Sequence, residues 1–440
     1  MLQEKSIKII ILLLSILLTY QGCNKEEEVK DEFDLKREQR EKEWNVSGQE
    51  IMAKSEEGER VSAEVSFEKK GEEEISQERP RKLRIGVLGP ETGELSDYGL
   101  KTMRGVQLAA DEINASGGIN GQPLEIFHYD TESGIAGTLK AAEQIIHDDI
   151  AAVIGSPTGE TTFSASKKFN DHQIIFMSAG TRRRLGDTGP YMFRNTLSDV
   201  DAANELIDYC INKLGMKNFA IVSSMNNDYS ITITALLKRS ILNKGYNIVE
   251  DIFLWSDTTA NISKDDTSIE SQIEKIKTKN PDAVIYTGDY LEGLNLAKEM
   301  RRKGIRVPLI GGEDLATEDF LKGGRDDVLG TIVYSGFYAD SQLAYVKNFV
   351  DSYKKKNGEY PDRIAALSYD ALNMVAEAFR KAQSMRPTHL RDSLKDITDF
   401  KGVTGFMSFN DSREVKKNAF ILKAEKKDGR LKFVLQGGEA

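Results

Sequence analysis

The sequence predicts an α/β fold made of two lobes, each with a parallel sheet covered by helices on both faces. From Leu83 onward, short apolar runs alternate with amphipathic helical patterns, and this alternation is typical of parallel sheets. It occurs as two consecutive series, each of the size of an ordinary Rossmann-like domain. The chain of 440 residues is too long for one compact domain, and its two cysteines are too few for a disulfide scaffold.

The first series predicts the sheet and helices of one lobe. The expected elements are strands at Leu83–Leu88, Leu124–His128, Ala151–Ile154 and Ile174–Met177, and helices at Lys101–Asn114, Ala136–His147 and Thr161–Phe169. The second series begins after Asp199 and predicts another lobe. Its expected helices are 200–213, 230–243, 268–278 and 291–303, and its expected strands are Phe219–Ser223, Ile248–Phe253, Ala283–Thr287, Val307–Ile310 and Thr331–Tyr334.

The remaining elements are too few for a third domain. They are two helices at about 341–356 and 364–383 and strands at Gly405–Phe409 and Ala419–Ala424. We expect lobe 1 to comprise residues 81–199 plus 336–402 and lobe 2 to comprise 200–335 plus 403–440, joined by a hinge that the chain crosses several times. Ligands of open α/β sheets lie beyond the carboxyl ends of the strands, so we expect a ligand in the cleft between the lobes.

Residues 1–22 have the pattern of a signal peptide. Two lysines precede the apolar run Ile9–Leu18, which is too short to span a bilayer as a helix. Cys23 then resembles the lipidated cysteine of a bacterial lipobox, although Tyr20 and Gln21 depart from the usual small or aliphatic residues. We expect a lipid anchor at Cys23; a plain secreted chain and an uncleaved anchor are the alternatives.

The formal net charge of −10 is concentrated before the lobes. Residues 24–80 hold 19 acidic and 11 basic side chains and few large apolar ones. Such a segment buries too little surface to offset the entropy of ordering it, so we expect residues 23–80 to form a charged, disordered tether. The rest of the chain is nearly neutral and shows no basic patch, which disfavours a nucleic-acid partner.

The sequence shows no motif of common enzyme chemistry. No dinucleotide or phosphate-binding glycine loop occurs, and no Gly-x-Ser-x-Gly elbow presents a nucleophile. The four histidines lie too far apart for metal-ligand spacing, and Cys210 lies in a helical apolar pattern typical of a buried thiol. We therefore expect a binding protein with no cofactor and no metal, rather than an enzyme.

Several segments resemble one known family in their order and spacing, across essentially residues 83–424. These segments are Ile85–Gly93, Tyr98-Gly99, Gly105, Asp111–Gly121, Asp130, Ala151–Gly155, Phe193-Arg194, Asp199, Gly311–Glu313 and Ser368–Ala371. They resemble the branched-chain amino acid (Leu/Ile/Val) binding proteins, which are type I periplasmic binding proteins of ABC transporters. The resemblance implies that fold, with an amino acid held in the interlobe cleft.

The resemblance also implies a carboxylate site on two loops of lobe 1. Thr158, Gly159 and Thr161 lie in the first loop, with Gly159 where the family commonly has a serine. Gly180 and Thr181 lie in the second loop, and Thr181 matches the family's carboxylate-binding threonine. Free N–H groups and hydroxyls at a helix start favour an anion. The alternative for these residues is ordinary capping of the next helix.

In lobe 2 the resemblance implies that Glu313 holds the ligand's amine. A solvated loop position or helix capping is the alternative for this glutamate. Tyr229 and Tyr290 match aromatic positions that cover the ligand, and Asp289, beside Tyr290, is an extra carboxylate expected to assist Glu313. Tyr98 is a weaker candidate in lobe 1.

The chain departs from the family at Arg182-Arg183-Arg184, which follows Thr181 directly. If Arg182 turns into the cleft, it grips a second carboxylate or a larger anion. The alternative is a basic turn exposed to solvent. This departure leaves open whether the ligand is a plain leucine, isoleucine or valine.

Together these features predict an extracytoplasmic receptor for an amino acid or a related small polar ligand, acting by hinge closure. Its expected partner is an ABC permease, and we expect a monomer in the bacterial cell envelope, lipid-anchored and facing the periplasm or exterior. Two alternatives remain: a sensing protein of the same fold that signals to a membrane receptor, and an enzyme that uses a cleft carboxylate.

Overall fold

The computed structural model describes residues 83–181, 184–225, 228–254 and 269–437. These residues all belong to one unit of the chain, Gln77–Ala440. The proposed signal peptide, Cys23, the proposed tether and Arg182 lie outside the described residues.

Lobe 1 is built on a parallel sheet with the strand order β2-β1-β3-β4-β5. Its strands are β1 (Arg84–Gly89), β2 (Glu125–Asp130), β3 (Ala152–Gly155), β4 (Ile175–Ser178) and β5 (Met192–Arg194). The central strands β1, β3 and β4 are almost fully buried, which explains why the sequence shows them as continuous apolar runs. The expected strands of the first series are present, and β5 is an addition to them.

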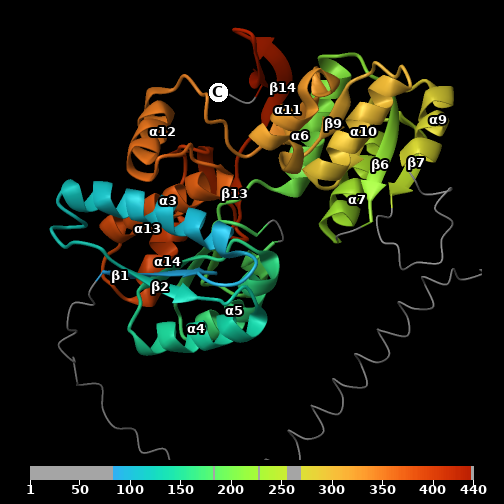
Figure 1. The fold of residues 1–440 in the computed structure, drawn as a ribbon. Helices are drawn as coiled ribbons and strands as arrows, with labels where there is room; N and C mark the ends of the chain where they lie inside the picture. The colour runs from blue at the N-terminus through green and yellow to red at the C-terminus, as the bar shows by residue number, and fades with distance from the viewer. Residues whose placement is uncertain (1–82, 182–183, 226–227, 255–268, 438–440) are drawn as a thin grey trace, which may run out of the picture. The chain divides into compact units, whose positions relative to one another are not determined.

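Helices cover both faces of this sheet (Figure 1). The helices of lobe 1 are α3 (Ser96–Ala115), α4 (Ile135–His147), α5 (Gly159–Asp171), α12 (Ala344–Asn357), α13 (Arg363–Lys381) and α14 (Pro387–Lys395). Helices α4 and α5 lie on one face, and α3, α13 and α14 lie on the other. The long helix α13 buries most of its apolar side chains against α3 and the sheet, so this C-terminal segment completes the lobe.

Lobe 2 is built on a seven-stranded sheet with the order β15-β14-β10-β9-β8-β6-β7. Its strands are β6 (Asn218–Ser224), β7 (Asn247–Leu254), β8 (Ala283–Thr287), β9 (Leu309–Gly311), β10 (Ile332–Ser335), β14 (Phe420–Lys427) and β15 (Arg430–Gly437). Its helices are α6 (Asp199–Asn212), α7 (Asp228–Asn243), α9 (Ile269–Lys279), α10 (Tyr290–Arg302) and α11 (Glu318–Gly324). Apolar side chains of α6 and α7 form one buried cluster with the sheet, and those of α9, α10 and α11 form another. The α/β class with two parallel-sheet lobes is therefore confirmed.

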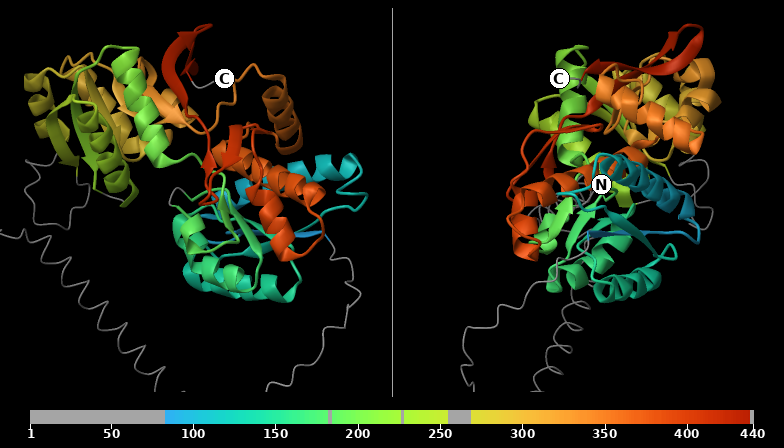
Figure 2. Two further views of the ribbon diagram at one scale, coloured as in Figure 1. Left: turned by 180° about the vertical axis from the view of Figure 1, so that it is seen from behind. Right: turned by 90° about the vertical axis from the view of Figure 1, so that its left-hand side faces the viewer.

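The edge of the lobe 2 sheet is a hairpin that the sequence analysis did not anticipate. Strand β14 is antiparallel to β10, and β15 pairs back onto β14 (red in Figure 2). The two-residue turn is Asp428-Gly429, and both residues have a positive φ. Asp-Gly is the dipeptide that such tight hairpin turns favour, so this signal was present in the sequence.

Residues 403–416 belong with lobe 1, although we assigned them to lobe 2. Strands β11 (Phe400–Gly402), β12 (Gly405–Phe409) and β13 (Val415–Lys416) form a small antiparallel sheet. Met407 and Val415 lie in the apolar core of lobe 1, and the Phe409 ring packs 5.2 Å from that of Phe193. The lobe boundary therefore follows β13, because β12 buries its apolar side chains against lobe 1.

A buried carboxylate ties helix α13 to this small sheet. Asp370 is buried and accepts hydrogen bonds from the backbone N–H groups of Val403 and Thr404, both at 2.8 Å, and from the Thr404 hydroxyl at 2.6 Å. Lys417 is 4% exposed and donates to the same hydroxyl at 3.0 Å. Burial lowers the pKa of Lys417 to about 8, which the nearby Asp370 charge opposes.

We predict that Asp370→Asn lowers the free energy of unfolding by about 3 kcal/mol, because it removes a charged acceptor and the negative charge of Asp370 near the buried Lys417. Urea denaturation measures this change. The matched control is Asp171→Asn, an exposed aspartate paired with Lys167 at 2.6 Å, which should change the free energy by less than about 0.5 kcal/mol. Equal effects of the two substitutions would contradict this role of Asp370.

Cys210 lies in the apolar face of α6 and is fully buried. Burial raises the pKa of its thiol to about 12, so almost no thiolate exists near neutral pH.

In a Cys23→Ser chain, Cys210 is the only cysteine. We predict that iodoacetamide labels this variant at least about a hundredfold more slowly in buffer near pH 8 than in concentrated urea. Similar rates in the two conditions would show that the thiol is accessible in the folded protein.

Candidate functional site

Two loops of lobe 1 meet at the carboxyl ends of neighbouring strands. The first follows β3 and leads into α5, which begins at Gly159; the second follows β4 and contains Gly180 and Thr181. A Cβ atom on Gly159 would lie 3.4 Å from the Thr181 hydroxyl oxygen, and one on Gly180 would lie 2.4 Å from the Pro157 Cα. The close approach at Gly180 excludes any larger residue. The structure thus brings the two expected carboxylate-site loops into contact.

The hydroxyls of the first loop bond to one another. Thr161 Oγ1 is 2.6 Å from Thr158 Oγ1 and also contacts the Ser156 hydroxyl. Thr158 is the N-cap residue of α5, and its carbonyl accepts from the Thr162 hydroxyl at 2.6 Å. Thr161 is buried. These contacts link the hydroxyls at the start of α5, although the Thr158 side chain makes no capping hydrogen bond to the helix, and the backbone of Gly159 lies at the junction of the loops.

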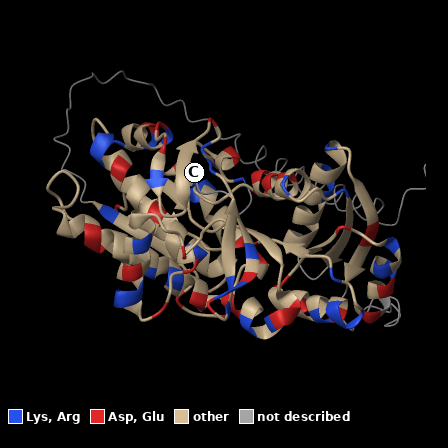
Figure 3. Ribbon diagram, turned by 90° about the horizontal axis from the view of Figure 1, so that it is seen from above, with Lys and Arg blue, Asp and Glu red and all other residues tan. Residues whose placement is uncertain are grey.

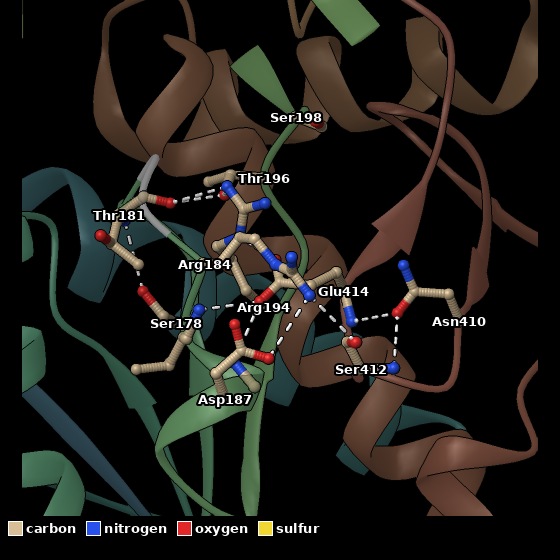
Figure 4. Close-up of polar contacts among 12 residues, drawn as sticks. Ser178, Thr181, Arg184, Asp187, Arg194, Thr196, Ser198, Asn410, Ser412 and Glu414 are labelled. Atoms are coloured by element: carbon tan, nitrogen blue, oxygen red, sulfur yellow. Dashed lines mark hydrogen bonds and ion pairs between the residues drawn. The ribbon is translucent and has the colours of Figure 1, made fainter. Parts of the chain in front are cut away.

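Thr181 is different, because its hydroxyl is buried and has no hydrogen-bond partner among the described residues. Its backbone is well held: the N–H donates to Ser178 Oγ at 3.3 Å, and the carbonyl accepts from Thr196 Oγ1 at 2.6 Å (Figure 4). A buried hydroxyl without a partner costs free energy. An unpaired hydroxyl beside a helix start is a strong indication of a ligand position.

A buried ion pair holds the second loop in place. Arg194, at the end of β5, is 2% exposed and pairs through Nε with the Glu414 carboxylate, which is itself buried. Its Nη1 donates to Thr196 Oγ1 at 3.1 Å and to the Thr181 carbonyl at 3.5 Å. Glu414 Oε1 accepts from the N–H groups of Leu185 and Gly186, at 2.8 and 3.0 Å (Figure 4). The loop is therefore fixed on both sides of the arginine triplet.

Arg184 is the one member of the triplet within the described residues. It is exposed and donates to Asp187 Oδ1 at 3.3 Å and to Ser412 Oγ at 3.1 Å (Figure 4). This arrangement is that of a basic turn at the surface. Arg182, the residue we expected to reach the ligand, lies outside the described residues.

In lobe 2, Glu313 follows β9 and begins a short 3-10 helix, Glu313–Leu315. Its side chain is 8% exposed. Oε1 accepts from the Gly336 N–H at 2.6 Å, and Oε2 lies 3.1 Å from Nε of Arg363. Glu313 is thus neither a solvated loop residue nor a helix-capping partner, and it already has an internal cation. Its contact with the amine of a ligand stays a prediction.

The other expected lobe 2 residues have identifiable structural partners. The Tyr229 hydroxyl donates to Asp199 Oδ1 at 3.1 Å and lies 3.0 Å from the Tyr334 hydroxyl. Asp289 is the N-cap of α10, and its carboxylate accepts from the N–H groups of the second and third helical residues at 2.8 and 3.0 Å. This is local capping, which explains the residue without a ligand. Tyr290 is half-buried against the lobe 2 core. Tyr98, the weaker candidate in lobe 1, is 44% exposed in α3.

Another carboxylate, that of Glu292, lies near the carboxyl ends of the lobe 2 strands. Glu292, in the first turn of α10, accepts from the Tyr286 hydroxyl at 2.8 Å. Burial raises the pKa of Glu292, and its hydrogen bonds to Ser224 and Tyr286 oppose this shift. The carboxyl ends of the lobe 2 strands are therefore acidic, with Asp289, Glu292, Glu313 and Asp314 at or just beyond them.

Sequence reasoning missed Glu414 and Arg363 and gave Arg194 no role. Arg194 appears in a segment that carries the family resemblance, but Glu414 lies 220 residues away in a stretch that reads as exposed. Arg363 follows the capping residue Asp362 and reads as a solvated first-turn residue. Nothing in a single sequence pairs these distant charges.

Neither a metal-binding cluster nor a membrane-spanning helix occurs among the described residues. In the ranges that the structure describes, His, Cys, Asp and Glu side chains do not gather in any group of three or more suited to a metal ion. Nor does any described helix have the length and apolar character needed to cross a membrane. Basic and acidic residues are interspersed along the ribbon of both lobes (Figure 3), which matches the near-neutral composition of this part of the chain.

Comparison with known proteins places this geometry in one family. The model of the periplasmic binding protein family matches residues 82–430. The "Amino acid binding protein" of Pseudomonas aeruginosa is 26% identical over 316 residues, which are 71% of this chain and 82% of that protein.

Solved structures show the same fold. The branched-chain amino acid transporter substrate binding protein LivJ of Streptococcus pneumoniae, in complex with isoleucine, has a TM-score of 0.66 and 27% identity, covering 80% of this chain and 99% of that one. A solute binding protein of Rhodopseudomonas palustris BisB5, in complex with 3,4-dihydroxybenzoic acid, has a TM-score of 0.66 and 22% identity, covering 81% and 96%. The family model matches most of the chain, and the fold of the chain is that of these solved structures. The chain therefore belongs to the periplasmic binding protein family and has the type I fold.

Proposed function

We propose that this protein is the extracytoplasmic solute receptor of an ABC importer and binds a small carboxylate ligand, with an amino acid of the branched-chain type as the first candidate. The observation that carries the proposal is the Thr181 hydroxyl, which is buried and has no partner among the described residues. A Cβ atom on Gly159, at the start of α5, would lie 3.4 Å from this hydroxyl oxygen. A carboxylate there would accept from this hydroxyl and from the free N–H groups of the helix start.

The ligand class follows from chemistry that the relatives share. Isoleucine in the Streptococcus pneumoniae complex and 3,4-dihydroxybenzoic acid in the Rhodopseudomonas palustris complex both carry one carboxylate. The Pseudomonas aeruginosa relative is named an amino acid binding protein. These comparisons support a carboxylate as the constant feature of the ligand and an amino acid as the favoured member of that class.

Three crossings between the lobes support a mechanism of hinge closure. The chain passes from lobe 1 to lobe 2 after β5, returns after β10, and passes again between β13 and β14. In the proposed mechanism, the ligand binds first to the lobe 1 loops, and rotation about these crossings brings Tyr229 and Tyr290 over it. The closed form is then the form that a permease recognises.

We predict that Thr181→Val separates ligand binding from stability. The valine methyl replaces an unpaired hydroxyl, so the melting temperature should stay unchanged or rise, whereas affinity should fall about 10- to 100-fold because a hydrogen bond to a charged group is lost. Calorimetric titration with amino acids, guided by mass spectrometry of ligand released from natively purified protein, measures the affinity.

The matched control is Thr138→Val, also at a buried threonine. Its hydroxyl donates to the Gly134 carbonyl at 2.7 Å, so this variant should lose about 1 kcal/mol of stability and keep its affinity. If Thr181→Val binds as tightly as the unaltered protein, the carboxylate site does not lie at Thr181.

The proposed location rests on the N-terminal sequence. Residues 1–22 have a signal-peptide pattern, and Cys23 is the proposed site of lipidation, with residues 24–80 as the tether.

When the full chain is exported in a bacterial host, we predict that it partitions into the detergent phase of a phase-separating detergent. The Cys23→Ser variant should enter the aqueous phase. A full chain that stays in the aqueous phase would point to plain secretion.

A further inference from the structure

Glu313 has internal counter-charges in this protein. Its Oε2 lies 3.1 Å from Nε of Arg363, and the side chains of these residues are 8% and 22% exposed. The buried Lys417 ammonium also lies near enough for the Glu313 charge to raise the pKa of that lysine. The carboxylate expected to attract a ligand's ammonium group is therefore already neutralised by the protein.

The position of Arg363 is not explained by its own helix. Arg363 is the first residue of α13, directly after the N-cap Asp362, whose carboxylate accepts from the Ala365 N–H at 2.9 Å. A cation in the first turn of a helix faces the positive end of the helix dipole, which is unfavourable. Because Arg363 belongs to lobe 1 and Glu313 to lobe 2, the favourable contact comes from the opposite lobe.

We propose that Arg363 is a specificity-determining residue that supplies the cation for Glu313, so that the ligand does not need an α-ammonium group. This inference rests on the proposed function, because it assumes a carboxylate ligand at Thr181. An ammonium group approaching Glu313 meets a carboxylate whose charge is balanced and a guanidinium of like charge at its side. The site therefore binds an amino acid and its 2-oxo acid with similar affinity.

A purely structural role for Arg363, as a tie between the lobes, makes a different prediction. Losing a tie would change the affinity for all ligands by a similar factor, because closure would be altered equally. Losing the counter-cation would change the ratio between ligands with and without an ammonium group. The ratio of affinities, rather than either affinity alone, therefore tests the proposal.

The experiment uses calorimetric titration of the purified protein with leucine, isoleucine and valine and with their three 2-oxo acids. In the unaltered protein we expect each amino acid and its 2-oxo acid to differ in affinity by less than about tenfold. Arg363→Gln should shift this ratio toward the amino acid by about tenfold or more, since the negative charge of Glu313 is then no longer balanced by the guanidinium and attracts the ammonium group. Arg363→Lys keeps the charge and should keep the original ratio.

The matched control is Arg104→Gln. Arg104 pairs with Glu359 and is 28% exposed, close to the exposure of Arg363, but Arg104 and Glu359 both belong to lobe 1. It should leave the ratio unchanged. A preference of the unaltered protein for amino acids above about a hundredfold would overturn the inference, even if Arg363→Gln fails to fold. So would an unchanged ratio in a folded Arg363→Gln protein.

The outcome also separates this inference from the proposed function. If the unaltered protein binds the amino acids but strongly prefers them over the 2-oxo acids, the proposed function stands and the role of Arg363 is wrong. If neither ligand series binds, the proposed ligand class is wrong, and the inference falls with it.

Discussion

The buried ion pair between Arg194 and Glu414 is the contact on which the candidate site depends. Removing both charges from water is costly, and the cost is offset only because each group makes further hydrogen bonds. Arg194 reaches the Thr181 carbonyl, and Glu414 takes two backbone N–H groups of the same loop. The pair therefore fixes the loop that presents the Thr181 hydroxyl. Its carboxylate partner, Glu414, lies 220 residues after Arg194 in the sequence.

The two lobe 1 loops differ in a way that bears on function. In the first loop, the hydroxyls of Ser156, Thr158 and Thr161 contact one another, so the loop is stable by itself. In the second, the Thr181 hydroxyl is left unpaired although the backbone around it is held. A folded protein bears that cost where a bound partner can supply the missing acceptor. The proposed carboxylate site would therefore be preformed in lobe 1 before any movement of lobe 2.

The sequence could predict the elements because their signals are local. Apolar periodicity located the strands and helices of both series, and the Asp-Gly turn of β14–β15 was readable in the same way. Asp289, which we expected near the ligand, is the N-cap of α10, and this local capping signal was also present in the sequence. The pairs Arg194–Glu414 and Arg363–Glu313 depend on tertiary structure, and an isolated sequence shows such residues only as separate charges.

The crossings show where a rotation between the lobes can occur. In the first crossing, Asn195 donates to the Leu367 carbonyl of lobe 1 at 2.8 Å, and Ser198 caps α6 of lobe 2. Only two residues lie between these two points of attachment. In the third, Lys417 bonds to Thr404 of lobe 1 and the Ala419 N–H to Glu205 of lobe 2, leaving one residue. Hinges absorb motion in a few backbone dihedrals. These short intervals confine the pivot of any such rotation to a few residues, and Glu313 lies beside the second crossing, where it accepts from the Gly336 N–H.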